Sequence, residues 1–331
     1  MQFSFTLTLP TKLPKLPHSL KTQSAQNYLP DEGLEGALST ALHLGLPLLL
    51  TGEPGTGKTQ LAYYLAQHYD LANPFKFETK SVSISRDLFY IYDALGRFHM
   101  AQDNTIKQKR TVDYITYHAL GQAIILTRLE EEVKSYLPMN FKHTGPQRSV
   151  VLIDEVDKAP RDFPNDILSE VEAMYFRIPE LGNVKIEANQ DYKPIIVLTS
   201  NSEKHLPDAF LRRCVFYHIP FPERDKLEAI VDAYVNDIMP QQNYNSLKPS
   251  TKFAIALDFF FMLRDPNNGL RKKPSTAELI NWLTALQKLF NTVDDPLQEC
   301  PHEVLPTLGI LGKTRTDLEI VHQLFVSKFI T

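Results

Sequence analysis

A glycine-rich segment at residues 52–59 carries the residue types whose spacing is most informative about chemistry. It reads G-x-x-x-x-G-K-T, follows the apolar residues 48–50, and precedes apolar residues at helical spacing. Glycines let backbone N–H groups approach phosphate oxygens, Lys58 adds a positive charge, and the Thr59 hydroxyl can ligate Mg²⁺. A glycine-rich turn without a ligand would fit the same letters, but the strand–loop–helix setting favours a nucleotide site. The candidate nucleotide-binding residues are Gly52, Glu53, Pro54, Gly55, Thr56, Gly57, Lys58, Thr59 and Gln60.

A second candidate element is the apolar run at residues 150–153, which ends in Asp154 and Glu155. Such a run is typical of a buried parallel strand whose carboxyl end opens onto a site. Asp154 would hold Mg²⁺, usually through water, and Glu155 would polarise the water that attacks the γ-phosphate. Considered by itself, this pattern would be explained more simply by a strand that runs into an acidic turn without a catalytic role. After a well-formed phosphate loop, it predicts the catalytic carboxylate and, with Thr59, the metal site.

Polar residues also end a third apolar run, at residues 195–198, and the last of them is Asn201. If the three strands are neighbours in one parallel sheet, Asn201 would lie between the other two and could position the attacking water. A short predicted helix then carries Arg212 and Arg213 and leads into another strand at residues 215–219. This arginine pair could serve catalysis or could simply form surface ion pairs.

The charge and the composition narrow the class of protein. A net charge of −4 over 331 residues gives no electrostatic footprint for nucleic acid, so tight binding by the monomer is disfavoured. The first residues lack the pattern of a signal peptide, and no apolar run reaches membrane-spanning length. We therefore expect a cytoplasmic protein with no membrane association. Cys214 and Cys300 are far apart and indicate neither a disulfide framework nor a zinc site.

The remaining chain predicts a two-part organisation. Residues 1–27 read as a strand at 3–9 and a Pro-rich connector, residues 28–222 as an α/β core, and residues 223–331 as a smaller all-α domain. Asp31 is expected to cap a helix that ends near Gly45. An insertion at about 97–148 should contain a basic cluster at 107–110, more simply solvated surface than a ligand site, and a helix over 112–136. Further helices are expected at 160–173, 223–239, 251–264, 275–290 and 317–329.

A hairpin insert is expected at about 174–187, where two β-prone runs flank residues 180–183. Tyr175 and Phe176 at its start could contact a substrate, or they could form the small core of the hairpin itself.

Taken in order, these motifs resemble those of AAA+ ATPases. Residues 49–55 (LLTGEPG), 152–159 (LIDEVDKA) and 210–214 (FLRRC) are similar to the MoxR-like, dynein-related branch, and the resemblance is specific over residues 28–222. It implies a P-loop NTPase αβα core with five parallel strands, a helical lid, and rings, usually hexameric, with ATP at subunit boundaries. In such rings a neighbour's arginine completes the site, and Arg213 matches that position best, with Arg212 as the alternative.

The resemblance also implies a function and a kind of partner. We expect Mg²⁺-dependent ATP hydrolysis by a homo-oligomer that remodels or matures a protein partner, for which a von Willebrand factor A domain protein is the family-based guess. A sensor arginine is missing at the start of the lid helix, where only Arg271, Lys272 and Lys273 lie upstream. Two alternatives remain open, a nucleic-acid motor of the restriction or defence type and an ATP-gated scaffold with little turnover.

Overall fold

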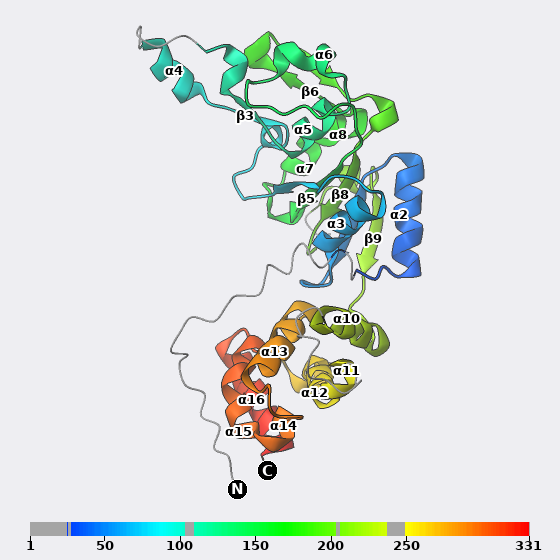
Figure 1. Cartoon of the computed structure of the whole chain (residues 1–331), viewed down its shortest axis with the longest axis vertical. Coiled ribbons are helices and arrows are strands. Elements are labelled where there is room, and N and C mark those ends of the chain that lie inside the picture. Colours follow the sequence, from blue (N-terminus) through cyan, green and yellow to red (C-terminus); the bar gives the residue numbers. More distant parts are fainter. Residues whose placement is uncertain (1–24, 26–27, 103–108, 203–205, 237–248, 331) are drawn as a thin grey trace. The chain divides into compact units, whose positions relative to one another are not determined.

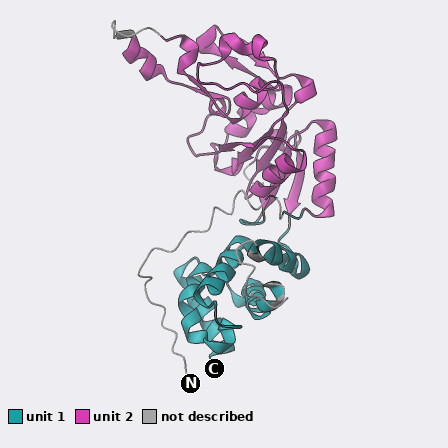
Figure 2. Ribbon diagram, in the orientation of Figure 1, with its two compact units in different colours: residues 1–29, 53–56, 220–331 teal, residues 30–52, 57–219 magenta. Residues whose placement is uncertain are grey.

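The computed structural model describes residue 25 and residues 28–102, 109–202, 206–236 and 249–330. The chain divides into two compact units (Figure 2), one grouping residues 1–29, 53–56 and 220–331, and the other residues 30–52 and 57–219. The strand expected at 3–9, residues 107 and 108 of the predicted basic cluster, and the end of the helix expected at 223–239 lie outside the described residues. None of the described helices is both long and apolar enough to cross a membrane. The domain limits given above stay predictions.

The second unit is built on a five-stranded parallel sheet with the strand order β2-β5-β8-β1-β9. Its strands are β1 (Leu48–Gly52), β2 (Phe75–Glu78), β5 (Val150–Asp154), β8 (Ile195–Thr199) and β9 (Val215–Ile219). Every residue of β1 and β5 is buried, as expected for central parallel strands covered on both faces. The α/β architecture predicted from the sequence is confirmed (Figure 1).

The helices of the second unit are α2 (Glu32–Leu44), α3 (Lys58–His68), α4 (Ala94–Gln102), α5 (Ala119–Ile125), α6 (Glu130–Val133), α7 (Phe163–Asp166), α8 (Leu168–Ala173) and α9 (Asp208–Leu211). Helices α2, α3 and α5 contact strands of the sheet, whereas α4 lies away from it (Figure 1). As predicted, the Asp31 carboxylate caps α2 by accepting from the Leu34 N–H at 2.8 Å, and α2 ends at Gly45 in the left-handed conformation. Asp31 also accepts a hydrogen bond from Tyr217 on β9, which fastens the start of α2 to the edge of the sheet.

The prediction of a single helix over residues 112–136 is wrong. The segment instead contains a short 3₁₀ turn, the strand β4 (Ile115–Tyr117), α5 and α6. β4 pairs antiparallel with β3 (Tyr90–Tyr92). The apolar residues at the start of the segment therefore belong to a strand, and the helix begins only after it. After α5, the Thr127 hydroxyl donates to the Ile124 carbonyl and accepts from the Asn189 N–H, which ends the helix.

The strands β6 (Tyr175–Ile178) and β7 (Val184–Glu187) pair antiparallel where the hairpin insert was expected. Phe176 is 1% exposed and stacks on Phe89, with ring centroids 5.4 Å apart. Phe176 is therefore part of the large apolar core of the second unit, and not of a small core confined to the hairpin. Tyr175 is partly exposed, and the Lys185 ammonium lies 4.4 Å from its ring centroid. Before this hairpin, the helix expected at 160–173 is broken at Ile167 into α7 and α8.

The C-terminal part of the first unit is all-helical and has its own apolar core. Its helices are α10 (Arg224–Asn236), α11 (Pro249–Lys252), α12 (Ala254–Arg264), α13 (Thr276–Leu289), α14 (Pro296–Glu299), α15 (Pro301–Val304) and α16 (Arg315–Phe329). Phe259, Trp282 and Phe325 are fully buried at its centre. Ser275 and Glu278 form a capping box that starts α13. The predicted helical region is confirmed.

Asp317, in the first turn of α16, is fully buried and joins that helix to the preceding loop. Its carboxylate accepts the N–H groups of Arg271 (2.9 Å) and Lys272 (3.3 Å). Burial alone would raise the pKa of Asp317, but the hydrogen bonds from Arg271, Thr314 and Lys272 outweigh it and lower the pKa. The carboxylate therefore stabilises the fold at pH values above the unfolded pKa of about 3.9, and this contribution is lost as the pH falls through the lower folded pKa.

Asp317→Asn is expected to lower the free energy of unfolding by about 1–3 kcal/mol at neutral pH, because it removes a buried charged acceptor from two backbone N–H groups. Denaturant unfolding followed by circular dichroism measures this change. The difference from the wild type should shrink on acidification below about pH 4. Asp294→Asn, at an exposed position of the same unit, is the control. Equal unfolding midpoints for all three proteins would contradict the role of Asp317.

Candidate functional site

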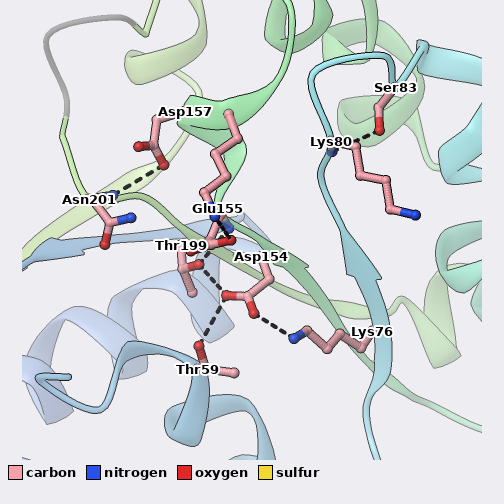
Figure 3. Close-up of polar contacts among 10 residues, drawn as sticks. Thr59, Lys76, Lys80, Ser83, Asp154, Glu155, Asp157, Thr199 and Asn201 are labelled. Atoms are coloured by element: carbon pink, nitrogen blue, oxygen red, sulfur yellow. Dashed lines mark hydrogen bonds and ion pairs between the residues drawn. The ribbon is translucent and has the colours of Figure 1, made fainter. Parts of the chain in front are cut away.

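The carboxylate of Asp154, at the carboxyl end of β5, is the point on which the candidate site converges (Figure 3). The hydroxyls of Thr59 (3.0 Å) and Thr199 (2.6 Å) both donate to its Oδ1. The Lys76 ammonium lies 2.8 Å from its Oδ2. Three strands and the start of α3 contribute to this group, because the carboxyl ends of parallel strands meet at one edge of the sheet.

The phosphate-binding segment predicted from the sequence connects β1 to α3. Gly57 has φ 88° and directly precedes Lys58, the first residue of α3, so a side chain with Cβ would be strained there. The Lys58 ammonium donates to the Gly52 carbonyl at 2.8 Å and its side chain is buried in the loop. The loop thus presents a helix N-terminus and a positive charge, the two features that suit an anion.

Within residues 53–56, the Thr56 hydroxyl donates to the Glu53 carbonyl at 2.9 Å and closes a turn. Gly55 has φ 79°, a conformation that favours glycine, and both Glu53 and Pro54 are exposed. Gln60 lies in the first turn of α3, where its N–H donates to the Gly57 carbonyl. These positions complete the set of candidate nucleotide-binding residues.

Asp154 is only 6% exposed, and its surroundings keep it ionised. Burial alone would raise its pKa, but hydrogen bonds from Lys76, Thr199 and Thr59 and the positive charge of Lys76 together lower it. Burial alone would lower the pKa of Lys76, but the hydrogen bond to Asp154 and the negative charges of Asp154 and Glu78 together raise it. A charged carboxylate beside a threonine hydroxyl is a set of hard oxygen donors that fits Mg²⁺.

Glu155 follows Asp154 in the left-handed conformation, with φ 57° and ψ 50°. This conformation is unfavourable for a residue with a side chain, and it is held by a hydrogen bond from the Glu155 N–H to the Thr199 hydroxyl at 2.9 Å. The Glu155 carboxylate turns away from the core and pairs with Lys158 in the following 3₁₀ turn. The two adjacent carboxylates therefore differ in their environment. Asp154 is buried and held by hydrogen bonds, while Glu155 is partly exposed.

Asn201 lies just beyond the end of β8, and β8 lies between β5 and β1, which is the strand arrangement expected from the sequence. The Asn201 N–H donates to the Asp157 carboxylate at 3.2 Å, and the residue is exposed next to Glu155 (Figure 3). A bond between backbone and carboxylate fixes the position of Asn201 while leaving its amide side chain at the surface.

Residues 47–214 match the sequence profile of the family described as the AAA domain of the dynein-related subfamily, and this match covers slightly more than half of the chain. The chain belongs to this family. The protein is accordingly an AAA+ ATPase, whose members bind nucleotide and hydrolyse ATP, and members of the family commonly assemble into rings.

Solved structures with a similar backbone include the RuvB Holliday junction branch migration motor of Thermotoga maritima, which is 15% identical, with 90% of this chain and 74% of that chain covered and a TM-score of 0.46. A mutant of the same RuvB is 16% identical, with 89% and 74% covered and a TM-score of 0.48. A comparison with curated proteins finds no match. The family assignment rests on the sequence profile.

In this AAA+ ATPase, Arg212 and Arg213 follow α9 and are both exposed. The Arg213 guanidinium donates to the Glu172 carboxylate at 3.0 Å and to the Ala209 carbonyl at 3.2 Å. Among the described residues, neither arginine contacts the Asp154 group. The structure therefore brings together the phosphate loop, Asp154, Glu155 and the end of β8, and places the arginine pair elsewhere on the same unit.

Of the three basic residues considered as a sensor in the AAA+ lid, Arg271 and Lys272 are held through their backbone N–H groups by Asp317. The side chains of all three, including Lys273, belong to exposed residues of the first unit. This arrangement does not single out one of them.

Two residues of the site, Thr199 and Lys76, were missed by the sequence analysis. Thr199 bridges Asp154 and the Glu155 N–H, and Lys76 pairs with Asp154 from the edge strand β2. A polar residue at the end of an apolar strand is a signal that could have identified Thr199. Lys76 gives no such signal, since an alternating strand with a lysine on one face is typical of ordinary surface.

Proposed function

We propose that this protein hydrolyses ATP with Mg²⁺ at the Asp154 site, within a ring-shaped homo-oligomer, and uses the energy to remodel or mature a protein partner. The observation that carries the proposal is the convergence of Thr59 and Thr199 on one oxygen of a buried, ionised Asp154. A loop with a lysine at a helix N-terminus lies directly beside it. This combination suits the triphosphate of a nucleotide together with a divalent cation.

Each residue has a distinct role in the proposed reaction. Backbone N–H groups of residues 52–60 cradle the phosphates, and Lys58 turns from the Gly52 carbonyl to the β- and γ-phosphates. Thr59 and Asp154 would hold Mg²⁺, which when bound neutralises the charge of the phosphate oxygens. Glu155 orients and polarises the attacking water, and Asn201 helps to position it.

A hexameric ring would complete the site with Arg213 from the neighbouring subunit. Support for this part of the proposal comes from the ring assembly common in the family and from the exposure of Arg213 away from its own Asp154 group. A positive guanidinium brought to the γ-phosphate would stabilise the charge of the transition state. The MoxR-like phrases of the sequence make a von Willebrand factor A domain protein the first partner to test.

Lys58→Ala is expected to weaken ATP binding by roughly 100-fold or more, since the phosphates lose a charge-assisted hydrogen bond in a buried loop. Equilibrium binding of a fluorescent ATP analogue in the presence of Mg²⁺ measures this effect. Lys142→Ala, at an exposed loop position, is the matched control and should bind as the wild type does. Undiminished binding by Lys58→Ala would overturn the assignment of the phosphate loop.

The assembly and the type of work are tested by measuring ATP turnover per subunit against protein concentration. A steep rise supports a site completed between subunits, while a constant value contradicts the ring. Stimulation of turnover by a candidate protein partner supports remodelling. Salt-sensitive stimulation by DNA would instead favour a nucleic-acid motor, and bound ATP without turnover would favour a scaffold.

A further inference from the structure

Lys76 reaches the site from the edge strand β2. In the register of β2 and β5, Glu78 lies opposite Asp154 and Lys76 lies opposite Leu152. Residues 76 and 78 share one face of the strand, since side chains alternate along it. From this position the Lys76 side chain, 28% exposed, extends to Asp154 and ends 2.8 Å from Oδ2 (Figure 3).

Through this contact, Lys76 brings a full positive charge to Asp154. Oδ1 accepts hydrogen bonds from two neutral hydroxyls, and Oδ2 is paired with Lys76. The Asp154 side chain is 9% exposed, so an uncompensated negative charge there would be costly. Lys76 therefore stabilises the ionised carboxylate in the metal-free chain.

Asp154 is also the carboxylate proposed to hold Mg²⁺. A lysine ammonium and a divalent cation at the same carboxylate repel each other, and the repulsion is strong in a partly buried site. The cation must then either bind less tightly because of this repulsion or displace the lysine ammonium from Asp154. The metal-free pairing of Lys76 thus opposes occupation of Asp154 by Mg²⁺.

The structure offers Lys76 a second position. A cavity of about 400 Å³ borders β2 and is lined by Lys76, Glu78, Lys80, Ser83 and Asp87 among others. Glu78 is the acidic residue on the same strand face, and it already interacts electrostatically with Lys76. A lysine side chain can turn within this space from Asp154 towards Glu78, because its four-carbon stem is flexible.

We propose that Lys76 is a resident counter-ion of Asp154 that excludes Mg²⁺ from the nucleotide-free site and yields to it when nucleotide brings further negative charge, moving then to Glu78. The inference rests on the proposed Mg²⁺–ATP site. The Mg²⁺ concentration needed for nucleotide binding then depends on how strongly Lys76 pairs with Asp154 compared with Glu78.

The test is a Mg²⁺ titration of binding of a fluorescent ADP analogue at a fixed, subsaturating concentration, without hydrolysis. Lys76→Met should lower the Mg²⁺ concentration for half-maximal binding about tenfold, because a hydrogen-bonded charge no longer competes. Glu78→Gln should raise it about twofold to threefold, because the displaced lysine loses an exposed partner. Lys76→Arg keeps the charge and should behave as the wild type. Lys80→Met, at another lysine that lines the cavity, is the control.

Thermal unfolding in the presence of a chelator gives a second readout. Lys76→Met should unfold at a lower temperature than the wild type, while Lys76→Arg and Lys80→Met should not. If Lys76→Met does not fold, the raised Mg²⁺ midpoint expected for Glu78→Gln, beside the unchanged midpoint expected for Lys76→Arg, still decides the matter. Unchanged Mg²⁺ midpoints in Lys76→Met or Glu78→Gln, with Mg²⁺-dependent binding by the wild type, would overturn the role of Lys76 alone. Absence of nucleotide binding by the wild type would instead overturn the proposed function.

Discussion

ATP turnover by Glu155→Gln is expected to fall about 10²–10⁴-fold while ATP still binds, because glutamine keeps the shape of the side chain but cannot accept the proton of the attacking water. The backbone around residue 155 should not change. Its left-handed conformation is held by the N–H bond to Thr199, which glutamine retains. The Glu155 carboxylate is partly exposed and forms an ion pair with Lys158, so its loss should cost little stability.

Single-turnover release of phosphate, measured beside equilibrium ATP binding, separates the two effects. Glu187→Gln, on the exposed face of β7, is a matched control that should keep full turnover. Turnover by Glu155→Gln within twofold of the wild type would show that another group activates the water. Weak ATP binding by the variant would show that Glu155 has a binding role instead.

The second large effect is expected for Arg213→Ala, which should reduce turnover about 10³–10⁵-fold with nearly unchanged ATP binding. Arg213 contacts Glu172 and Ala209 at the surface of its own subunit and is not part of the Asp154 group. An exposed ion pair of this kind contributes about 0–1 kcal/mol to stability, so unfolding cannot account for the loss. Steady-state ATPase rates at a protein concentration that favours assembly provide the measurement. Arg177→Ala, on β6, is the matched exposed arginine.

Mixing Arg213→Ala with Lys58→Ala distinguishes a shared site from a site within one chain. If the proposed ring forms, an intact phosphate loop of one subunit can meet an intact Arg213 of the next, so part of the activity should return. No return at any mixing ratio would argue that Arg213 acts within its own subunit or not at all. Loss of turnover in Arg212→Ala but not in Arg213→Ala would move the role to the neighbouring arginine.

The sequence predicts those parts of the site that lie on strands with a continuous apolar run. Asp154 and Asn201 each follow such a run, and the parallel sheet then brings their strand ends together beside the phosphate loop. Glycines at positions with positive φ are likewise recognisable, since Gly57 has to open α3 in a conformation that other residues avoid.

Contacts between residues far apart in the sequence could not be predicted in this way. Thr199 meets Glu155 across 44 positions, and Lys76 meets Asp154 from a strand that carries no distinctive pattern. Their roles depend on the register between strands, which a single sequence does not determine. The incorrect helix over residues 112–136 has a related cause. Val112 and Ile115 are three residues apart, as on one face of a helix, but the pairing of Ile115 and Tyr117 with β3 decides the local structure.

One apolar cluster connects the sheet with the segment between β2 and β5. Val151 and Ile153 of the sheet belong to the same cluster as Ala123 and Ile124 of α5. Gly121 packs so closely against the Phe89 carbonyl that an added Cβ would lie 2.0 Å from that oxygen. In a shortened chain lacking α5, the apolar face of the sheet that packs against this helix would therefore be exposed to water. A truncated ATPase domain should therefore retain the whole segment between β2 and β5. Substitutions on the surface of this segment should leave α5 intact.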